Sequence, residues 1–318
     1  MTASKYNIAL KCALCLQFLL LIAIGNAQQN PFPPNLSLPE ARRGFHTQLA
    51  PQKEPKEPLE RAPAALFRTV KYPSAAGELA AYLSPNPGDR VKHPAILWIT
   101  GGDCNSIGNV WSPKARSNDQ TAAAYLKAGI VMMFPSLRGG NTNPGVKEGF
   151  LGEVDDVLAA ADYLAKQPYV DPKRIYLGGH STGGTLAMLV AECSTRFRAV
   201  FAFGPVADVG MYGEDSGFLP FKVSDRKEVV LRSPYYWLSS IRSPVWVIEG
   251  ADGNISSLWV MRKAPHTPTT SFIEIKDVDH FGTLAPTNSL LAKKILQDTG
   301  EKSRISLSTD EVNRLFTH

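Results

Sequence analysis

A serine stands between glycines in a short stretch whose residue types suit nucleophilic catalysis. The stretch reads Gly179-His180-Ser181-Thr182-Gly183. A serine hydroxyl is a poor nucleophile, so it must project clear of the backbone toward a base. A very tight turn achieves this, and glycines remove the side chains that would clash there. The pattern alone occurs by chance in roughly one chain in ten of this length. It therefore predicts a nucleophile only if a strand precedes it and a helix follows it.

That setting is present around Ser181. Residues 174–177 read Arg-Ile-Tyr-Leu, typical of a strand, and residues 182–192 are rich in the small residues of a closely packed helix. His180 lies next to the serine, and on such a turn its side chain should point elsewhere. We therefore interpret His180 as a residue that packs near the site or supports a catalytic residue, rather than as the base.

A catalytic serine at this kind of junction is followed along the chain by an acid and then by a histidine. His280 lies just after the expected strand 271–276 and before the last long helix, which is where a base belongs. His266 precedes that strand, and His318 is the terminal residue. We predict His280 as the base.

The acid should lie on the loop after the expected strand 245–249, where it would orient the imidazole and stabilise its charged form. Asp252 is in that position, and we predict that it completes the triad. Glu249 lies at the strand end and competes with it, and Asp279 is a further alternative.

A tetrahedral intermediate also needs two fixed N–H donors for its oxyanion. One should be the backbone N–H of Thr182, directly after the nucleophile. The other should come from the loop after the expected strand 95–100, which begins Gly101-Gly102. A glycine pair lets the backbone approach the reacting carbonyl closely, but the sequence leaves open which of the two donates.

Strands and helices alternate along the rest of the chain, which predicts an α/β fold with a mostly parallel central sheet and helices on both faces. Residues 208–240 interrupt the alternation and are expected to form an insertion near the active-site edge. Apolar runs and alternating patterns predict strands at 67–72, 78–83, 95–100, 130–135, 174–178, 199–203, 245–249 and 271–276. Helical spacing predicts helices at 122–128, 151–166, 182–192, 288–297 and 308–316.

The N-terminal segment is expected to direct export. Lys5 and Lys11 give a positive start, residues 12–25 are uncharged and mostly apolar, and small residues follow up to Ala27. This pattern predicts a signal peptide over 1–27 and a periplasmic or secreted protein, with an uncleaved membrane anchor as the alternative. Residues 28–64 are rich in Pro, Gln, Lys and Glu, and are predicted to form an extended linker or tail. The hydrolase domain is then expected over 65–318.

Composition excludes several kinds of partner. The formal charge is +5, and removal of Lys5 and Lys11 would leave +3. That is too weak and dispersed for nucleic acid binding or for attachment to an anionic membrane. No Cys/His spacing resembles a metal site, and the expected chemistry needs no cofactor. Cys104 and Cys193 would remain after cleavage, and the sequence leaves open whether they pair.

Taken together, these residues resemble the catalytic domain of the prolyl oligopeptidase family, within the α/β-hydrolases. The resemblance extends from Phe67 to Gln297, and by it Ser181, Asp252 and His280 carry over as the triad. One matching segment is the turn around Ser181, residues 179–184, which we call the nucleophile elbow. The other matching residues are Phe134-Pro135-Ser136-Leu137-Arg138-Gly139-Gly140, then Asp156, Ala160, Tyr163 and Leu164, then Asp171, Arg174 and Ile175, and finally Ser243-Pro244.

The sequence departs from that family in two ways. The loop Gly250-Ala251-Asp252 is one residue shorter than the usual spacing. The large β-propeller that restricts the family to small peptides is also missing between the expected signal peptide and the domain. An ester is therefore as plausible a substrate as a peptide.

The predicted function is a serine hydrolase that cleaves an ester or amide bond of a small-molecule or peptide substrate. Arg138 is a candidate for binding a substrate carboxylate, with a purely structural role as the alternative. A binding module without turnover and an acyltransferase that uses the same triad are the competing functions.

Overall fold

We analysed a computed structural model of the chain, which describes residues 30–52, 56–213 and 217–317. The predicted signal peptide, 1–27, lies outside the described residues. Within them, no helix is both long and apolar enough to cross a membrane.

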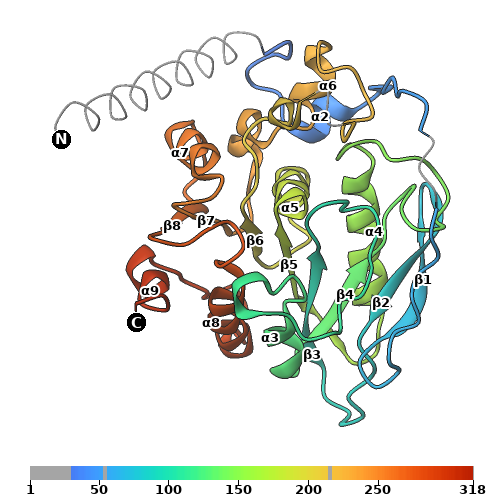
Figure 1. The fold of residues 1–318 in the computed structure, drawn as a ribbon, viewed down its shortest axis with the longest axis vertical. Coiled ribbons are helices and arrows are strands. Elements are labelled where there is room, and N and C mark those ends of the chain that lie inside the picture. The colour runs from blue at the N-terminus through green and yellow to red at the C-terminus, as the bar shows by residue number, and fades with distance from the viewer. Residues whose placement is uncertain (1–29, 53–55, 214–216, 318) are drawn as a thin grey trace, which may run out of the picture.

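A single eight-stranded sheet forms the centre of the described fold, in the order β1-β2-β4-β3-β5-β6-β7-β8 (Figure 1). The first two strands pair antiparallel with each other, β2 is antiparallel to β4, and the remaining neighbours are parallel. The strands are β1 Arg68–Ser74, β2 Gly77–Leu83, β3 His93–Ile99, β4 Val131–Pro135, β5 Val170–His180, β6 Val200–Phe203, β7 Val245–Gly250 and β8 Thr270–Ile275. Each overlaps a predicted strand, and the predicted α/β-hydrolase fold is confirmed.

Helices cover both faces of this sheet. On one face α4, α5 and α7 share a core with the insertion, and on the other α3, α8 and α9 share a second core. The α-helices are α2 Leu38–Arg42, α3 Ala123–Lys127, α4 Glu153–Ala165, α5 Thr182–Cys193, α6 Arg226–Val230, α7 Ile255–Lys263, α8 Leu284–Gln297 and α9 Thr309–Asn313.

Alternation along the strands explains the two cores. In β3, Leu97 and Ile99 face the core beneath α5, whereas Ile96 and Trp98 face the opposite core. Successive side chains of a strand point to opposite faces, so a strand covered on both sides must be apolar throughout. This is why β3 and β4 appear in the sequence as unbroken apolar runs.

The insertion contains short helical turns rather than long elements. Besides α6 it includes the 3₁₀ turns Val209–Tyr212, Pro234–Tyr236 and Leu238–Ser240, and a further turn, Arg116–Asn118, precedes α3. The insertion lies between the end of β6 and the start of β7, at the edge of the sheet where the parallel strands end. Its position agrees with the prediction.

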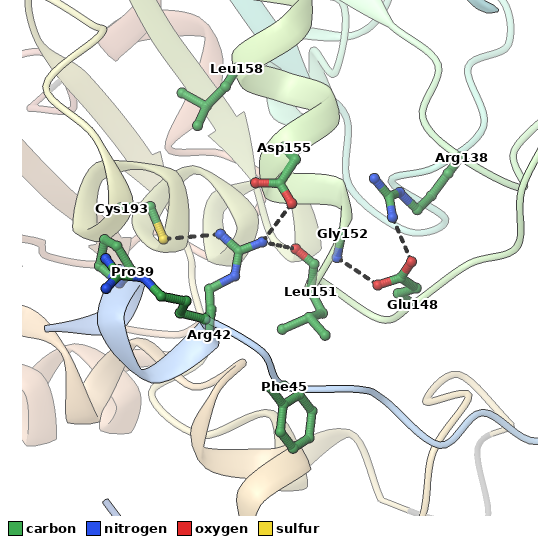
Figure 2. Close-up of a pocket in the computed structure, with 11 residues that line it drawn as sticks. Pro39, Arg42, Phe45, Arg138, Glu148, Leu151, Gly152, Asp155, Leu158 and Cys193 are labelled. Atoms are coloured by element: carbon green, nitrogen blue, oxygen red, sulfur yellow. Dashed lines mark hydrogen bonds and ion pairs between the residues drawn. The ribbon is translucent and has the colours of Figure 1, made fainter. Parts of the chain in front are cut away.

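The N-terminal segment differs from the predicted extended tail. Leu38 is 0% exposed and Ala41 is buried, and both belong to the core beneath α5. Pro39 lies in the first turn of α2, where its fixed φ favours a helix. Arg42 then donates to the carbonyl of Leu151 (2.8 Å), to Asp155 (2.9 Å) and to Cys193 Sγ (3.3 Å), as Figure 2 shows.

The same segment continues across the insertion. Thr47 Oγ1 and the backbone N–H of Gln48 both donate to the carboxylate of Glu228, and the N–H of Ala50 donates to the carbonyl of Pro220. We call residues 30–52 and 56–64 the N-terminal strap. Because the strap contributes buried side chains, the folded unit begins well before Ala65, and the predicted boundary is corrected. The sequence did not indicate this because the strap has few apolar residues and its partners lie far away along the chain.

Candidate active site

Ser181 lies at the strained turn that the sequence predicted. Strand β5 ends at His180, helix α5 begins at Thr182, and Ser181 between them has φ 57° and ψ −118°. A non-glycine residue at positive φ is uncommon and costly, and strained residues of this kind cluster at active sites. A Cβ on Gly179 would lie 2.3 Å from the carbonyl oxygen of Gly183, and one on Gly183 would lie 2.3 Å from that of Ile99. Both positions therefore require glycine.

The imidazole of His280 is paired with a buried carboxylate. Its Nδ1 lies 2.9 Å from Oε2 of Glu249, which is 1% exposed at the end of β7. The Glu249 carboxylate also accepts the backbone N–H groups of Gly250 (2.7 Å) and Asn254 (3.1 Å). These bonds fix the carboxylate, and a carboxylate that accepts from Nδ1 favours the imidazole tautomer with its proton on Nδ1.

The carboxylate that contacts His280 in the structure is thus that of Glu249, not that of Asp252. Asp252 is exposed, its backbone N–H donates to the carbonyl of Val278, and its carboxylate has no hydrogen-bond partner within the described ranges. The prediction favoured the loop residue Asp252, but β7 continues to Gly250 and the longer glutamate side chain reaches the imidazole from the strand. Asp279 instead accepts the N–H groups of Phe281 and Gly282, which shapes the turn beside His280.

A glycine at the end of β6 brings the histidine and the carboxylate close to the elbow. The N–H of Ser181 donates to the carbonyl of Phe203 at 2.8 Å, and Gly204 follows with φ +60°. A Cβ on Gly204 would lie 2.2 Å from Cε1 of His280 and 2.8 Å from Oε2 of Glu249. Ser181 Oγ has no hydrogen-bond partner in the part of the chain that the structure describes. Serine–histidine bonds are commonly long without substrate.

The predicted oxyanion loop is joined to the elbow. The hydroxyl of Thr182 donates to the carbonyl of Gly102 at 2.8 Å. A Cβ on Gly101 would lie 3.1 Å from Cβ of Ser181, so the loop backbone runs alongside the nucleophile. Thr182 is also the first residue of α5, where backbone N–H groups have no partner within the helix and face outward. Both predicted sources of N–H groups therefore adjoin Ser181.

A cavity of about 130 Å³ opens beside that loop. Phe150 forms part of its wall and stacks on Tyr212, with ring centroids 6.0 Å apart. The Tyr212 hydroxyl lies 3.2 Å from Oγ1 of Thr185, which in turn donates to the carbonyl of Ser181. The residues that line the cavity are Asp103, Cys104, Asn105, Lys147, Gly149, Phe150 and Phe218. It is thus a small, partly aromatic cavity, and part of its wall is the segment that follows Gly101 and Gly102.

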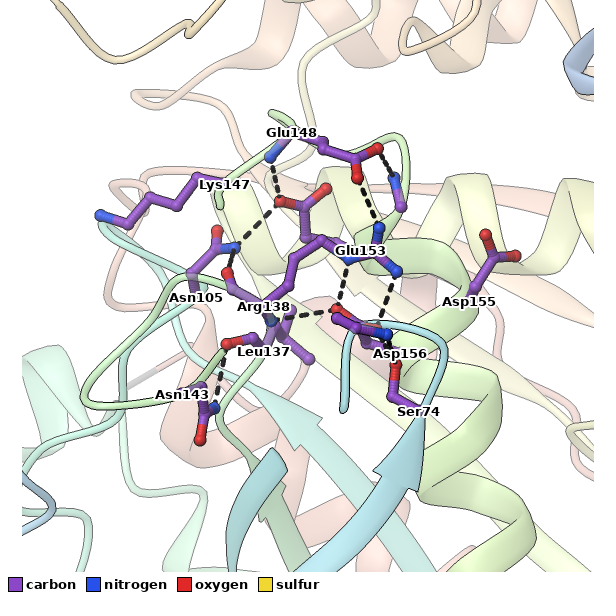
Figure 3. A network of polar contacts seen from close by, with 12 residues as sticks. Ser74, Asn105, Leu137, Arg138, Asn143, Lys147, Glu148, Glu153, Asp155 and Asp156 are labelled. Carbon is purple, nitrogen blue, oxygen red and sulfur yellow. Dashed lines mark hydrogen bonds and ion pairs between the residues drawn. The ribbon is translucent and has the colours of Figure 1, made fainter. Parts of the chain in front are cut away.

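Arg138 is held by the fold and is not presented to a substrate. It is 8% exposed, and its guanidinium donates to both carboxylate oxygens of Asp156 (2.8 and 2.9 Å) and to Glu148 at 2.5 Å (Figure 3). Its backbone N–H donates to Asp156 as well. The contacts therefore favour a structural role for Arg138 over the binding of a substrate carboxylate.

His180 is fully buried against the loop that carries His280. Its Nε2 lies 3.1 Å from the carbonyl oxygen of His280, and the two rings are 4.4 Å apart between centroids. Burial, and then the neighbouring His280, lower the pKa of His180 to about 3. His180 is therefore neutral at ordinary pH, and its ring faces the base loop rather than Ser181 Oγ.

Of the cysteines in the described part of the chain, neither Cys104 nor Cys193 forms a disulfide. Cys104 is buried and Cys193 is partly buried, and both are free thiols. Burial raises the pKa of the Cys193 thiol to about 11, so the reactive thiolate is scarce at neutral pH. Among the described residues, no group of three or more His, Cys, Asp or Glu side chains could hold a metal ion.

Comparison with known proteins gives a family and several relatives. Residues 117–244 match the prolyl oligopeptidase family. Prolyl oligopeptidase A of Amanita bisporigera is 31% identical over 125 residues, a match that covers 37% of this chain and 15% of that protein. An uncharacterized peptidase of Bacillus subtilis, YtmA, is 28% identical over 188 residues, covering 55% of this chain and 69% of that protein.

Solved structures show the same fold. The Pyrococcus horikoshii acylaminoacyl peptidase superposes with a TM-score of 0.59 at 16% sequence identity, over 77% of this chain and 43% of that one. Its elements thus correspond to the sheet and flanking helices described above. The chain therefore has the α/β-hydrolase fold, and its residues 117–244, which include the elbow, are similar to the prolyl oligopeptidase family.

Proposed function

We propose that the chain is a serine hydrolase that forms an acyl-enzyme on Ser181, with His280 as general base and Glu249 as the carboxylate that orients it. The observation that carries the proposal is the Nδ1–Oε2 contact of 2.9 Å between His280 and Glu249, placed over Gly204 beside a serine at positive φ. A buried carboxylate, an oriented imidazole and a strained serine in this arrangement suit acyl transfer.

In the proposed reaction, Ser181 Oγ attacks the substrate carbonyl while Nε2 of His280 takes its proton. The oxyanion is stabilised by the N–H of Thr182 and by an N–H of the Gly101–Gly102 loop, and the charged imidazole by Glu249. The imidazolium then gives its proton to the leaving amine or alcohol, and the acyl group remains on the serine. Water repeats the sequence and releases the acid.

The family match supports a peptidase over other serine hydrolases. The cavity lined by residues 103–105, which follow Gly101 and Gly102 in the chain, supplies space for one small substrate group, and its aromatic wall favours an apolar one. The triad chemistry itself serves amides and activated esters alike.

The test compares matched ester and amide substrates on three proteins. Short acyl nitrophenyl esters and aminoacyl or peptidyl naphthylamides are assayed with the wild type, Ser181→Ala and the control Ser239→Ala. Ser239 is exposed, and in the described residues its hydroxyl makes no hydrogen bond. We expect Ser181→Ala to lose at least about 10³-fold in kcat and Ser239→Ala to match the wild type.

The ratio of kcat/KM between the two substrate series then assigns the class. A preference for naphthylamides identifies a peptidase, and turnover confined to the esters identifies an esterase. Wild-type turnover that survives in Ser181→Ala would contradict the proposed nucleophile.

A further inference from the structure

We propose that His180 is a positioning residue: its Nε2–H holds the backbone carbonyl of His280 and so fixes the loop that carries the base. This inference rests on the proposed function. It concerns a residue that comes directly before the nucleophile and that, as described above, points away from the serine hydroxyl.

The contacts of His180 join three segments that are far apart in sequence. The residue ends β5, its Nε2 contacts the carbonyl of His280 at 3.1 Å, and its Nδ1 lies 3.1 Å from Oε1 of the Gln120 amide. Its ring also packs against Phe281, with centroids 5.4 Å apart. His180 therefore lies between the segment before α3, the elbow and the base loop, and it is 0% exposed.

The chemistry of these contacts fixes the tautomer. A backbone carbonyl only accepts hydrogen bonds, so Nε2 must carry the proton of the neutral ring. Nδ1 is then an acceptor, which requires the amide of Gln120 to turn its NH₂ toward it. The oxygen and nitrogen of an amide are assigned from the surrounding network. A neutral ring held in this way presents a fixed donor to His280 without adding a charge beside the imidazolium that forms during the reaction.

The carbonyl of His280 has two donors, and they act from different directions. Thr283 Oγ1 donates to it at 3.2 Å from the same loop, so that bond shapes the loop but does not anchor it. His180 belongs to the elbow, and its bond therefore ties the base loop to the nucleophile turn. Glu249 fixes the ring of His280, whereas His180 fixes its backbone. Both are needed to define where Nε2 points.

Three substitutions separate the hydrogen bond from packing. His180→Gln keeps a donor, because the glutamine amide nitrogen is the same number of bonds from Cβ as Nε2. His180→Asn places its amide at the reach of Nδ1, toward Gln120, and lacks the donor to His280. His180→Phe keeps an aromatic ring and has no donor.

The expected result is an order of activities that differs from the order of stabilities. In His180→Phe and His180→Asn we expect kcat to fall about 10-fold or more with KM within about twofold, since small misplacements of a base are costly. His180→Gln should retain most of the wild-type kcat. In thermal unfolding, however, His180→Phe should be more stable than His180→Gln, because it keeps the buried ring contacts.

The labelling rate with a fluorophosphonate provides a second readout that does not depend on substrate binding. It should fall in parallel with kcat in the same variants. The proposal is overturned if His180→Phe labels and turns over as the wild type does, or if His180→Gln is no better than His180→Phe. A wild-type protein that neither labels nor turns over would instead contradict the proposed function.

Discussion

Replacing Glu249 by glutamine removes one negative charge and changes little else in size. In the proposed mechanism that charge faces the imidazolium of His280 across a contact of 2.9 Å from a position that is 1% exposed. The amide can also turn its NH₂ toward Nδ1, which would favour the wrong tautomer of the imidazole. Both effects reduce the rate of the step in which His280 takes the serine proton.

The size of the loss follows from the geometry. Two unit charges whose centres are about 4 Å apart attract by about 4 kcal/mol at an effective dielectric constant of about 20. Since about 1.4 kcal/mol corresponds to a tenfold change in rate, kcat should fall about 10³-fold. KM should change little, because Glu249 is buried behind His280.

Asp252→Asn provides the matched control. It makes the same chemical change on the next acidic residue along the chain, whose carboxylate is exposed. Steady-state kinetics on one substrate should show a large fall in kcat for Glu249→Gln and a change within about twofold for Asp252→Asn. The reasoning is refuted if Asp252→Asn shows the large fall and Glu249→Gln retains activity. Thermal unfolding of both variants verifies that each is folded.

Three further predictions follow from particular contacts. Gly204→Ala should lower kcat by at least about tenfold, because its Cβ would lie 2.2 Å from Cε1 of His280. Kinetics that match the wild type would show that the His280–Glu249 pair does not lie against Gly204. Arg138→Met should lower the free energy of unfolding in urea by about 3–5 kcal/mol, because it leaves Asp156 buried without its partner; a loss below about 1 kcal/mol would contradict this role. His180, whose pKa in the folded chain is about 3 against 6.5 for the ordinary residue, is neutral when folded and charges on unfolding. Its contribution to stability is complete above about pH 6.5 and is lost as the pH falls toward about 3, by about 1.4 kcal/mol per pH unit, so His180→Gln should flatten the acid side of the stability curve. If the free energies of unfolding of the wild type and His180→Gln, measured in urea, fall in parallel as the pH is lowered, this prediction is wrong.

Local patterns predicted the scaffold well, because its elements are determined by short-range features. Unbroken apolar runs identified the buried strands, and the glycines around Ser181 identified a turn that only glycine permits. The order of residues along the chain then selected His280. The sequence did not predict helix α7, because only two of its apolar residues, Leu258 and Met261, are fully buried and they form too short a pattern.

The acid could not be chosen in the same way, because the choice depends on how far β7 extends and where its side chains point. Glu249 reaches His280 because β7 continues through Gly250 and because Gly253 has no side chain. A Cβ at position 253 would lie 2.5 Å from Oε1 of Glu249 and would collide with it. The loop, one residue shorter than the family spacing, was the signal that could have pointed to the strand residue. The strap was missed for a related reason, since its partners lie far away in sequence.

The most direct test of the central claim is to locate the nucleophile chemically. The wild-type protein is treated with a fluorophosphonate, digested, and the modified residue is identified by mass spectrometry, with Ser181→Ala and Ser239→Ala treated in parallel. We predict one adduct, on Ser181, which is absent from Ser181→Ala and present in Ser239→Ala. An adduct on another residue, or labelling that persists in Ser181→Ala, would contradict the account.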